Sequence, residues 1–205
     1  MKRIICYGDS NTWGFIPSSD HERYPSNIRY PRVLASLLGP EYEVIEEGLP
    51  GRTIISDDVV DLVGNRNGLL EFGMAVYSAL PLDYILIMLG TNDLKYSRSA
   101  KECAKALEEY IYRVSHKIGG RMKCDPKVII VAPSVIGEGL IENGIEVRKE
   151  SLNFNKEYEK VAKNNNCLFV DNEGLETGSD KIHLTVESQI LLAHKIYNVI
   201  NSYQK

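Results

Sequence analysis

Three short segments combine the residue types that hydrolytic enzymes use to cleave acyl bonds. They are Gly8-Asp9-Ser10, Gly90-Thr91-Asn92-Asp93 and Asp180-Lys181-Ile182-His183. A serine becomes nucleophilic when an adjacent base takes its proton, and an imidazole oriented by a carboxylate is such a base at neutral pH. An asparagine amide can donate a hydrogen bond to the oxyanion that then forms. Together these residue types indicate a serine hydrolase.

Ser10 is the candidate nucleophile. It follows a short apolar run, Arg3–Gly8, that ends in a glycine. A turn at this point could place the hydroxyl at the start of a helix, where unpaired N–H groups favour a developing negative charge. The alternative is an ordinary helix cap, because serine is common at that position. This segment alone leaves both interpretations open.

His183 is the candidate base and Asp180 its orienting carboxylate. The two residues are three positions apart, a spacing at which a turn can return the carboxylate to imidazole Nδ1. Nε2 would then be free to accept the serine proton. The other histidines have weaker claims, since His116 and His194 lie in helical patterns and His21 lies in a loop.

Asn92 and Gly51 are candidate donors to the oxyanion. Each follows a short apolar run of its own. The alternative for Asn92 is an Asx turn that caps the next helix, and the advantage of Gly51 is that glycine permits close approach of the backbone to a ligand. Arg52 could bind an anionic substrate group, but we favour a surface charge pair with Glu46 or Glu47.

Five apolar runs predict the strands that position these residues. They are Arg3–Gly8, Tyr42–Ile45, Tyr84–Leu89, Lys127–Ala132 and Cys167–Val170. Helical patterns lie between and after them, at Tyr30–Leu38, Leu69–Leu80, Ala100–Ile118, Lys149–Asn165 and Val186–Tyr203. Strands that are apolar throughout belong in a parallel sheet covered on both faces. We therefore predict a single domain over residues 1–205, a doubly wound, three-layer α/β/α sandwich with a five-stranded parallel sheet.

Two irregular stretches, Asn11–Arg29 and Pro133–Arg148, leave the predicted strand ends where the site would lie. Long loops in a compact domain are often functional, so both are candidate pocket walls. The alternative is that they are plain surface loops or subunit contacts. Asp9, Asn11 and Trp13 are the candidate pocket residues beside the nucleophile.

Composition limits the other classes of function. A net charge of −4 and a pI near 5.7 argue against nucleic acid as the main partner. The sequence has no signal-peptide core and no apolar stretch of membrane-spanning length, so we expect a cytoplasmic protein with no membrane partner. Cys6, Cys103, Cys124 and Cys167 are scattered without metal-ligand spacing, which indicates free thiols and no metal site.

In their order along the chain, the three segments and Gly51 resemble the four blocks of the SGNH (GDSL-type) hydrolases. The surrounding sequences Gly8–Gly14, Glu46–Thr53 and Met88–Asp93 are closest to the arylesterase and acyltransferase branch of that family. Lys181 departs from the pattern, because a glycine commonly follows the aspartate of the last block. The lack of a G-x-S-x-G elbow argues against the other large class of α/β hydrolases.

The resemblance implies a flavodoxin-like sandwich and assigns roles to the candidate residues. Ser10, Asp180 and His183 would form the triad, and the backbone of Ser10 and Gly51 with the side chain of Asn92 would form the oxyanion hole. Several members of the branch are oligomeric, so a homo-oligomer is a candidate assembly.

The predicted function is that of a serine esterase. It would hydrolyse short-chain acetyl or aryl esters of small molecules through an acyl-enzyme on Ser10, with no cofactor. One alternative is an acyltransferase or a carbohydrate deacetylase that uses the same site. A more distant one is a flavodoxin-like binder of FMN or phosphate, which the lack of a Gly-rich phosphate-binding loop disfavours.

Overall fold

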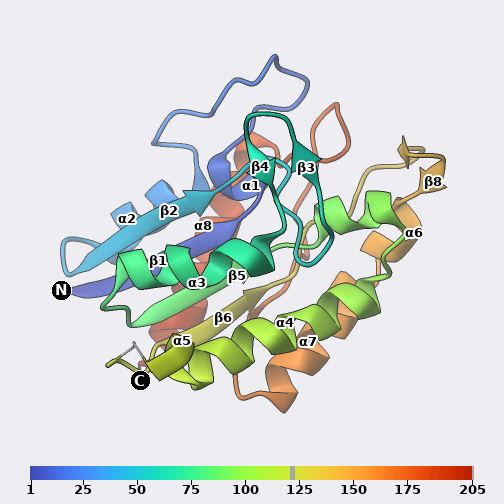
Figure 1. Cartoon of the computed structure of the whole chain (residues 1–205). Helices are drawn as coiled ribbons and strands as arrows, with labels where there is room; N and C mark the ends of the chain where they lie inside the picture. Colours follow the sequence, from blue (N-terminus) through green and yellow to red (C-terminus); the bar gives the residue numbers. More distant parts are fainter. Residues whose placement is uncertain (121–122, 205) are drawn as a thin grey trace.

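The computed structural model describes residues 1–120 and 123–204, and a five-stranded parallel sheet forms its centre (Figure 1). The strands lie in the order β2-β1-β5-β6-β9. Their bounds are Lys2–Gly8 for β1, Tyr42–Gly48 for β2, Tyr84–Met88 for β5, Lys127–Val131 for β6 and Leu168–Val170 for β9. The chain crosses from β1 to β2 on one side and from β5 to β6 on the other. The loops that follow β1 and β5 therefore diverge, which leaves a crevice at the carboxyl edge of the sheet.

Both faces of the sheet are buried, because successive strand side chains point to opposite faces. Ile5 and Tyr7 of β1 pack into the core on one face. Ile4 and Cys6 of the same strand pack into the core on the other face. This two-sided burial explains why the strands are apolar throughout instead of alternating with polar residues.

Helices cover the two faces (Figure 1). One face carries α3 (Gly68–Ala79), α4 (Ala100–Ser115) and α7 (Phe154–Asn164), and the other carries α2 (Tyr30–Leu38) and α8 (Val186–Tyr203). The predicted three-layer α/β/α sandwich is therefore confirmed, and α2 and α8 have the predicted bounds.

Two predicted helices end early or are interrupted. The prediction of one helix over Ala100–Ile118 is wrong, because Lys117 and Ile118 have positive φ and a short helix, α5 (Lys117–Gly120), follows. The predicted helix over Lys149–Asn165 is split into α6 (Arg148–Ser151) and α7. The Ser151 hydroxyl donates to the Arg148 carbonyl oxygen, a local bond of the kind that competes with helix continuation.

Short elements complete the loops at the carboxyl edge of the sheet. They are helix α1 (Ser10–Trp13), the 3₁₀ helix η1 (Thr91–Tyr96), the β3–β4 hairpin (Val59–Val60 with Gly64–Asn65) and the β7–β8 hairpin (Ile141–Glu142 with Ile145–Glu146). Thus the stretch Asn11–Arg29 begins in a helix, and the stretch Pro133–Arg148 contains a hairpin.

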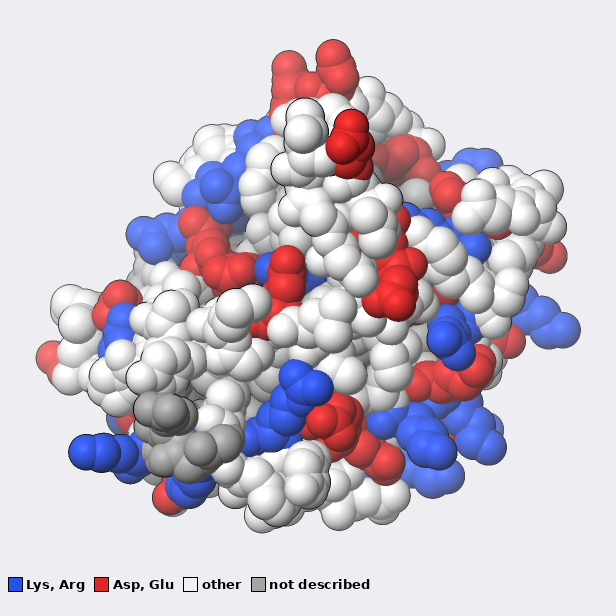
Figure 2. All heavy atoms as spheres, viewed as in Figure 1, with Lys and Arg blue, Asp and Glu red and all other residues white. Residues whose placement is uncertain are grey.

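The remaining observations concern surface charge, helix hydropathy and the cysteines. Basic and acidic side chains are interspersed over the face that Figure 2 shows. None of the helices described here is both long and apolar enough to cross a membrane. The four cysteines are free thiols, and within residues 1–120 and 123–204 no group of three His, Cys, Asp or Glu side chains could hold a metal ion.

Candidate active site

Ser10 is the first residue of α1 and follows β1 after a single residue. Asp9 caps this helix, since its carboxylate accepts the N–H of Asn11 at 2.9 Å. A Cβ on Gly8 would lie 2.0 Å from Thr12 Oγ1, so only glycine allows the strand to turn so tightly into the helix. The capping role therefore belongs to Asp9, and the Ser10 hydroxyl is left for another partner.

That partner is His183. The Ser10 Oγ lies 2.9 Å from His183 Nε2, and His183 Nδ1 lies 2.7 Å from Asp180 Oδ2. Because a carboxylate only accepts, Nδ1 carries the proton and Nε2 accepts from the serine. The structure thus brings together the three residues predicted for the triad.

Asp180 is held ionised by its own turn. Its Oδ1 accepts the backbone N–H groups of Ile182 at 3.0 Å and of His183 at 2.9 Å. Burial opposes ionisation, but hydrogen bonds from the imidazole and from these N–H groups outweigh it and hold the pKa of Asp180 well below its ordinary value. At neutral pH the imidazole therefore faces a full negative charge.

Lys181 occupies the position at which the SGNH pattern commonly has a glycine. Its backbone is in the left-handed region, with a φ of 69°, which glycine adopts without strain. The turn nevertheless closes, because the Lys181 N–H donates to the Gly178 carbonyl at 2.9 Å and its carbonyl accepts the N–H of Gly137 at 2.8 Å.

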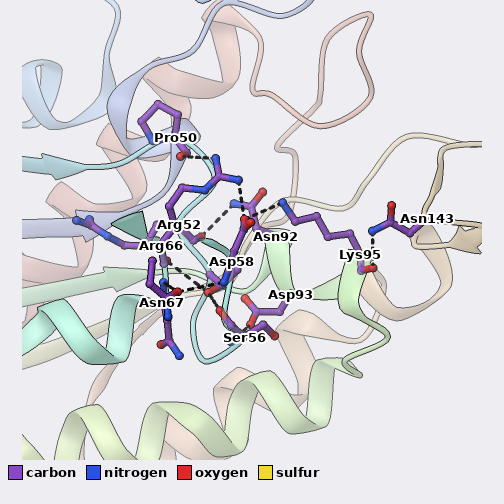
Figure 3. A network of polar contacts seen from close by, with 12 residues as sticks. Pro50, Arg52, Ser56, Asp58, Arg66, Asn67, Asn92, Asp93, Lys95 and Asn143 are labelled. Atoms are coloured by element: carbon purple, nitrogen blue, oxygen red, sulfur yellow. Dashed lines mark hydrogen bonds and ion pairs between the residues drawn. The ribbon is translucent and has the colours of Figure 1, made fainter. Parts of the chain in front are cut away.

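Asn92 lies in η1 with its side chain turned toward the loop that follows β2 (Figure 3). Its Nδ2 donates to the carbonyl oxygen of Arg52 at 3.0 Å. The N-cap of η1 is Gly90, so Asn92 does not cap this helix. One N–H of its amide is engaged by Arg52, and the second can point at a substrate oxygen.

Asp93 ties the same two loops together (Figure 3). Its fully buried carboxylate accepts three backbone N–H groups, from Ile54 at 2.6 Å, Ile55 at 3.2 Å and Ser56 at 3.0 Å. Burial raises the pKa of Asp93, and these three bonds act against that shift. The residue therefore fixes the position of η1 relative to the segment that follows Gly51.

Gly51 has a positive φ of 79° and a crowded Cα. A Cβ there would lie 2.0 Å from Nη1 of Arg66, whose guanidinium donates to the Pro50 carbonyl and to Asp58 (Figure 3). The described part of the chain supplies no hydrogen-bond acceptor for the Gly51 N–H. This N–H is thus available to a ligand.

Arg52 corrects a sequence prediction. It pairs with Glu47 at 3.0 Å as expected, but it is only 3% exposed and is not a surface charge. Its guanidinium also reaches Glu71 at 3.3 Å and lies 4.2 Å from the centre of the Tyr7 ring. The other expected partner, Glu46, pairs instead with Arg23 and Arg29 of the loop before α2.

The residues predicted for the pocket take different places. Trp13 is half-buried, and the guanidinium carbon of Arg23 lies over its indole, 5.2 Å from the centre of the ring. Asp9 and Asn11 are only 2% and 3% exposed and bond to backbone groups. Burial raises the pKa of Asp9 to about 6, although the N–H of Asn11 and the nearby His183 act in the opposite direction.

A small cavity of about 110 Å³ lies beside Asn92. It is lined by Thr91, Asn92, Lys95, Ile136, Leu140, Glu142, Val147 and Ile182. Half of these residues come from the stretch Pro133–Arg148, which was predicted to form a pocket wall. The other predicted wall, Asn11–Arg29, approaches the imidazole through Phe15, whose ring stacks on that of His183.

Comparison with known proteins gives a family match over most of the chain. Residues 6–188 match the GDSL-like Lipase/Acylhydrolase family. A search of curated proteins finds no match. Because the matched segment extends from β1 into α8, it contains every candidate site residue.

Solved structures resemble the whole chain. Est24, a carbohydrate acetylesterase from Sinorhizobium meliloti, is 32% identical with a TM-score of 0.88, over 99% of this chain and 100% of that one. The native aryl esterase of M. smegmatis is 31% identical with a TM-score of 0.87, over 98% and 99% of the two chains. A lipolytic G-D-S-L family member from Veillonella parvula DSM 2008 shares the fold at 18% identity, with a TM-score of 0.70 over 98% and 99%.

Proposed function

The chain belongs to the GDSL-like lipase/acylhydrolase family and is a carboxylic ester hydrolase, and we propose that it cleaves short-chain acyl esters through an acyl-enzyme on Ser10. One observation carries the proposal. Hydrogen bonds run without a break from Asp180 through His183 to the Ser10 hydroxyl, at 2.7 and 2.9 Å. This order of carboxylate, imidazole and hydroxyl is the one that general-base activation of a serine requires.

In the acylation step, Ser10 Oγ attacks the ester carbonyl carbon while His183 Nε2 takes the hydroxyl proton. Asp180, ionised at neutral pH, stabilises the imidazolium that forms. The carbonyl oxygen becomes an oxyanion that accepts hydrogen bonds from the N–H groups of Ser10 and Gly51 and from the amide of Asn92. The tetrahedral intermediate then collapses, and the departing alcohol takes its proton from His183.

Deacylation reverses these roles with water as the nucleophile. His183 Nε2 takes a proton from the water molecule as its oxygen attacks the acyl carbon. The second intermediate expels Ser10, which recovers its proton from the imidazolium, and a carboxylic acid leaves. The free enzyme is regenerated without any other reactant.

The size of the cavity beside Asn92 supports a short acyl group. A cavity of about 110 Å³ is small and suits a group of few heavy atoms. Ile136, Leu140, Val147 and Ile182 form an apolar part of its lining that suits a short hydrocarbon chain, and polar side chains line the rest. We therefore expect acetyl to butyryl esters to react and esters of long fatty acids to react poorly.

The test is hydrolysis of p-nitrophenyl acetate by the wild type and by Ser10→Ala. Turnover should fall by at least a thousandfold in Ser10→Ala. Ser78→Ala, which changes an exposed serine of α3, is the matched control and should retain wild-type turnover. Equal rates in Ser10→Ala and the wild type would contradict the nucleophile assignment.

A carbohydrate deacetylase is the second candidate, because the 32% identical Est24 is a carbohydrate acetylesterase. The chemistry at Ser10 would be the same, and only the alcohol would differ. Acetate release from an acetylated xylose compared with p-nitrophenyl acetate, at equal concentration, separates the two. A higher kcat/KM for the sugar ester would favour the deacetylase.

A further inference from the structure

Asn11 follows Ser10 directly, and its side chain bonds to the backbone on both sides of His183. Its Nδ2 donates to the Ile182 carbonyl oxygen at 3.4 Å, and its Oδ1 accepts the N–H of Leu184 at 2.9 Å. A carboxamide carries the same donor and acceptor as a peptide group. Asn11 therefore pairs with this segment much as a neighbouring strand would.

The backbone of Asn11 is itself fixed by hydrogen bonds. It is 3% exposed, its N–H donates to the Asp9 carboxylate at 2.9 Å, and its carbonyl accepts Nε2 of Gln189 at 2.9 Å. Gln189 is a fully buried residue of α8 that also accepts the N–H of Tyr30 at 2.9 Å. These bonds fix the backbone of Asn11, and its side chain cannot leave the Ile182 carbonyl and the Leu184 N–H without leaving buried polar groups unpaired.

The turn that contains His183 needs such a contact. Asp180 orients the imidazole within its own turn, but it does not set the distance of that turn from α1. Ser10 and His183 are 173 residues apart in the chain, so long-range contacts must fix their separation. Asn11 makes two of these contacts at the residue next to Ser10.

On the premise that Ser10 and His183 are nucleophile and base, as in the proposed function, we propose that Asn11 is a positioning residue. It sets the separation of Ser10 Oγ and His183 Nε2 by holding the backbone that flanks the imidazole. His183 serves both acylation and deacylation, so a displaced base slows both steps alike and changes neither their ratio nor ester binding. Loss of Asn11 therefore lowers kcat and leaves KM unchanged, whereas a residue that only stabilises the fold changes neither value per folded molecule.

The test uses two variants of Asn11 and one matched control. Asn11→Leu keeps the branched shape of the side chain but makes no hydrogen bonds, and Asn11→Ala removes both hydrogen bonds without added bulk or charge. Asn172→Leu is the control, because Asn172 is also buried and donates its amide to a backbone carbonyl. The readouts are kcat and KM for p-nitrophenyl acetate per folded molecule, and the melting temperature.

We expect kcat of Asn11→Leu to fall roughly 10- to 100-fold, the range that about 1 Å of misplacement costs, with KM within about twofold of wild type. Asn11→Ala should fall in the same range. Asn172→Leu should melt at a lower temperature and keep the wild-type kcat.

Wild-type kcat in Asn11→Leu, a change confined to KM, or an equal loss of kcat in Asn172→Leu would each overturn the positioning role. If Asn11→Leu does not fold, Asn11→Ala decides, since unchanged kcat overturns the role and lower kcat at unchanged KM supports it. Failure of the proposed function is seen separately, as wild-type turnover in Ser10→Ala.

Discussion

The ring of Phe15 lies parallel to the imidazole of His183, with ring centres 4.3 Å apart and planes 21° apart. Phe15 is brought there by a bridge between its backbone and that of Arg23, which folds the long loop after α1 back on itself. An aromatic face attracts a cation placed over it. The stacked ring therefore favours the imidazolium that forms when His183 accepts the Ser10 proton.

We expect Phe15→Leu to lower kcat about two- to fivefold, which corresponds to the roughly 0.5–1 kcal/mol of a cation–π contact at an accessible site. Phe15→Tyr keeps the aromatic face and should retain nearly all activity. The measurement is kcat for p-nitrophenyl acetate at saturating substrate. Equal values for the Leu and Tyr variants would show that the ring acts only by filling space.

Removal of the Asn92 side chain should slow the chemical step. The amide is proposed to donate to the oxyanion, and loss of one such donor typically costs about 3–4 kcal/mol of transition-state stabilisation. We expect kcat of Asn92→Ala to fall roughly 100- to 1,000-fold, with a smaller change in KM. Asn92→Asp is a useful companion, because its charge would repel the oxyanion and should be at least as damaging.

Lys181→Gly should stabilise the protein. Lysine at a φ of 69° is strained by its Cβ, and glycine relieves this strain at the cost of a more flexible unfolded chain. We expect the free energy of unfolding to rise by roughly 0.5–1 kcal/mol, measured by urea denaturation. Lys181→Ala removes the charge but keeps the Cβ, so a similar gain in that variant would assign the effect to charge instead.

Asp9 should make the stability of the protein depend on pH. Burial raises its pKa to about 6 in the folded protein, from an ordinary value of 3.8. Between these values the folded state binds more protons than the unfolded state, so the free energy of unfolding falls as pH rises, by roughly 2–3 kcal/mol in total. This loss of stability is complete above the folded pKa of about 6 and absent below pH 3.8.

Asp9→Asn is the variant that tests this dependence. Asparagine has nearly the same shape and can still cap α1 through its side-chain oxygen. Relative to wild type, the variant should gain stability steadily between about pH 4 and pH 7 in urea denaturation. A stability difference that stays constant over this range would contradict the assignment.

The sheet and most helices could be predicted because their signals are local. A strand that is buried on two faces can be recognised from its own residues, because they are apolar throughout. The helices α2 and α8 begin and end where the apolar periodicity of their own residues begins and ends. The segments around Ser10, Asn92 and His183 could be predicted for the same reason, since each follows or forms a short recognisable pattern.

Features that depend on distant partners could not be predicted. Burial of Arg52 requires a carboxylate from α3, and nothing near Arg52 in the sequence indicates that Glu71 will reach it. The split between α6 and α7 lies at Ser151, whose hydroxyl accepts the N–H of Ile136 from an earlier loop. Asn11 was expected to line a pocket because it follows Ser10, but its partners lie more than 170 residues further along the chain.

The separation of Ser10 and His183 also affects when the protein gains activity during synthesis. The first strand and α1 emerge from the ribosome early, but no imidazole can meet the serine until the segment 173 residues later has been translated and docked. Ester cleavage is thus a late reporter of folding. In a refolding experiment, hydrolysis should recover only once the segment around His183 has docked against α1, after secondary structure has formed.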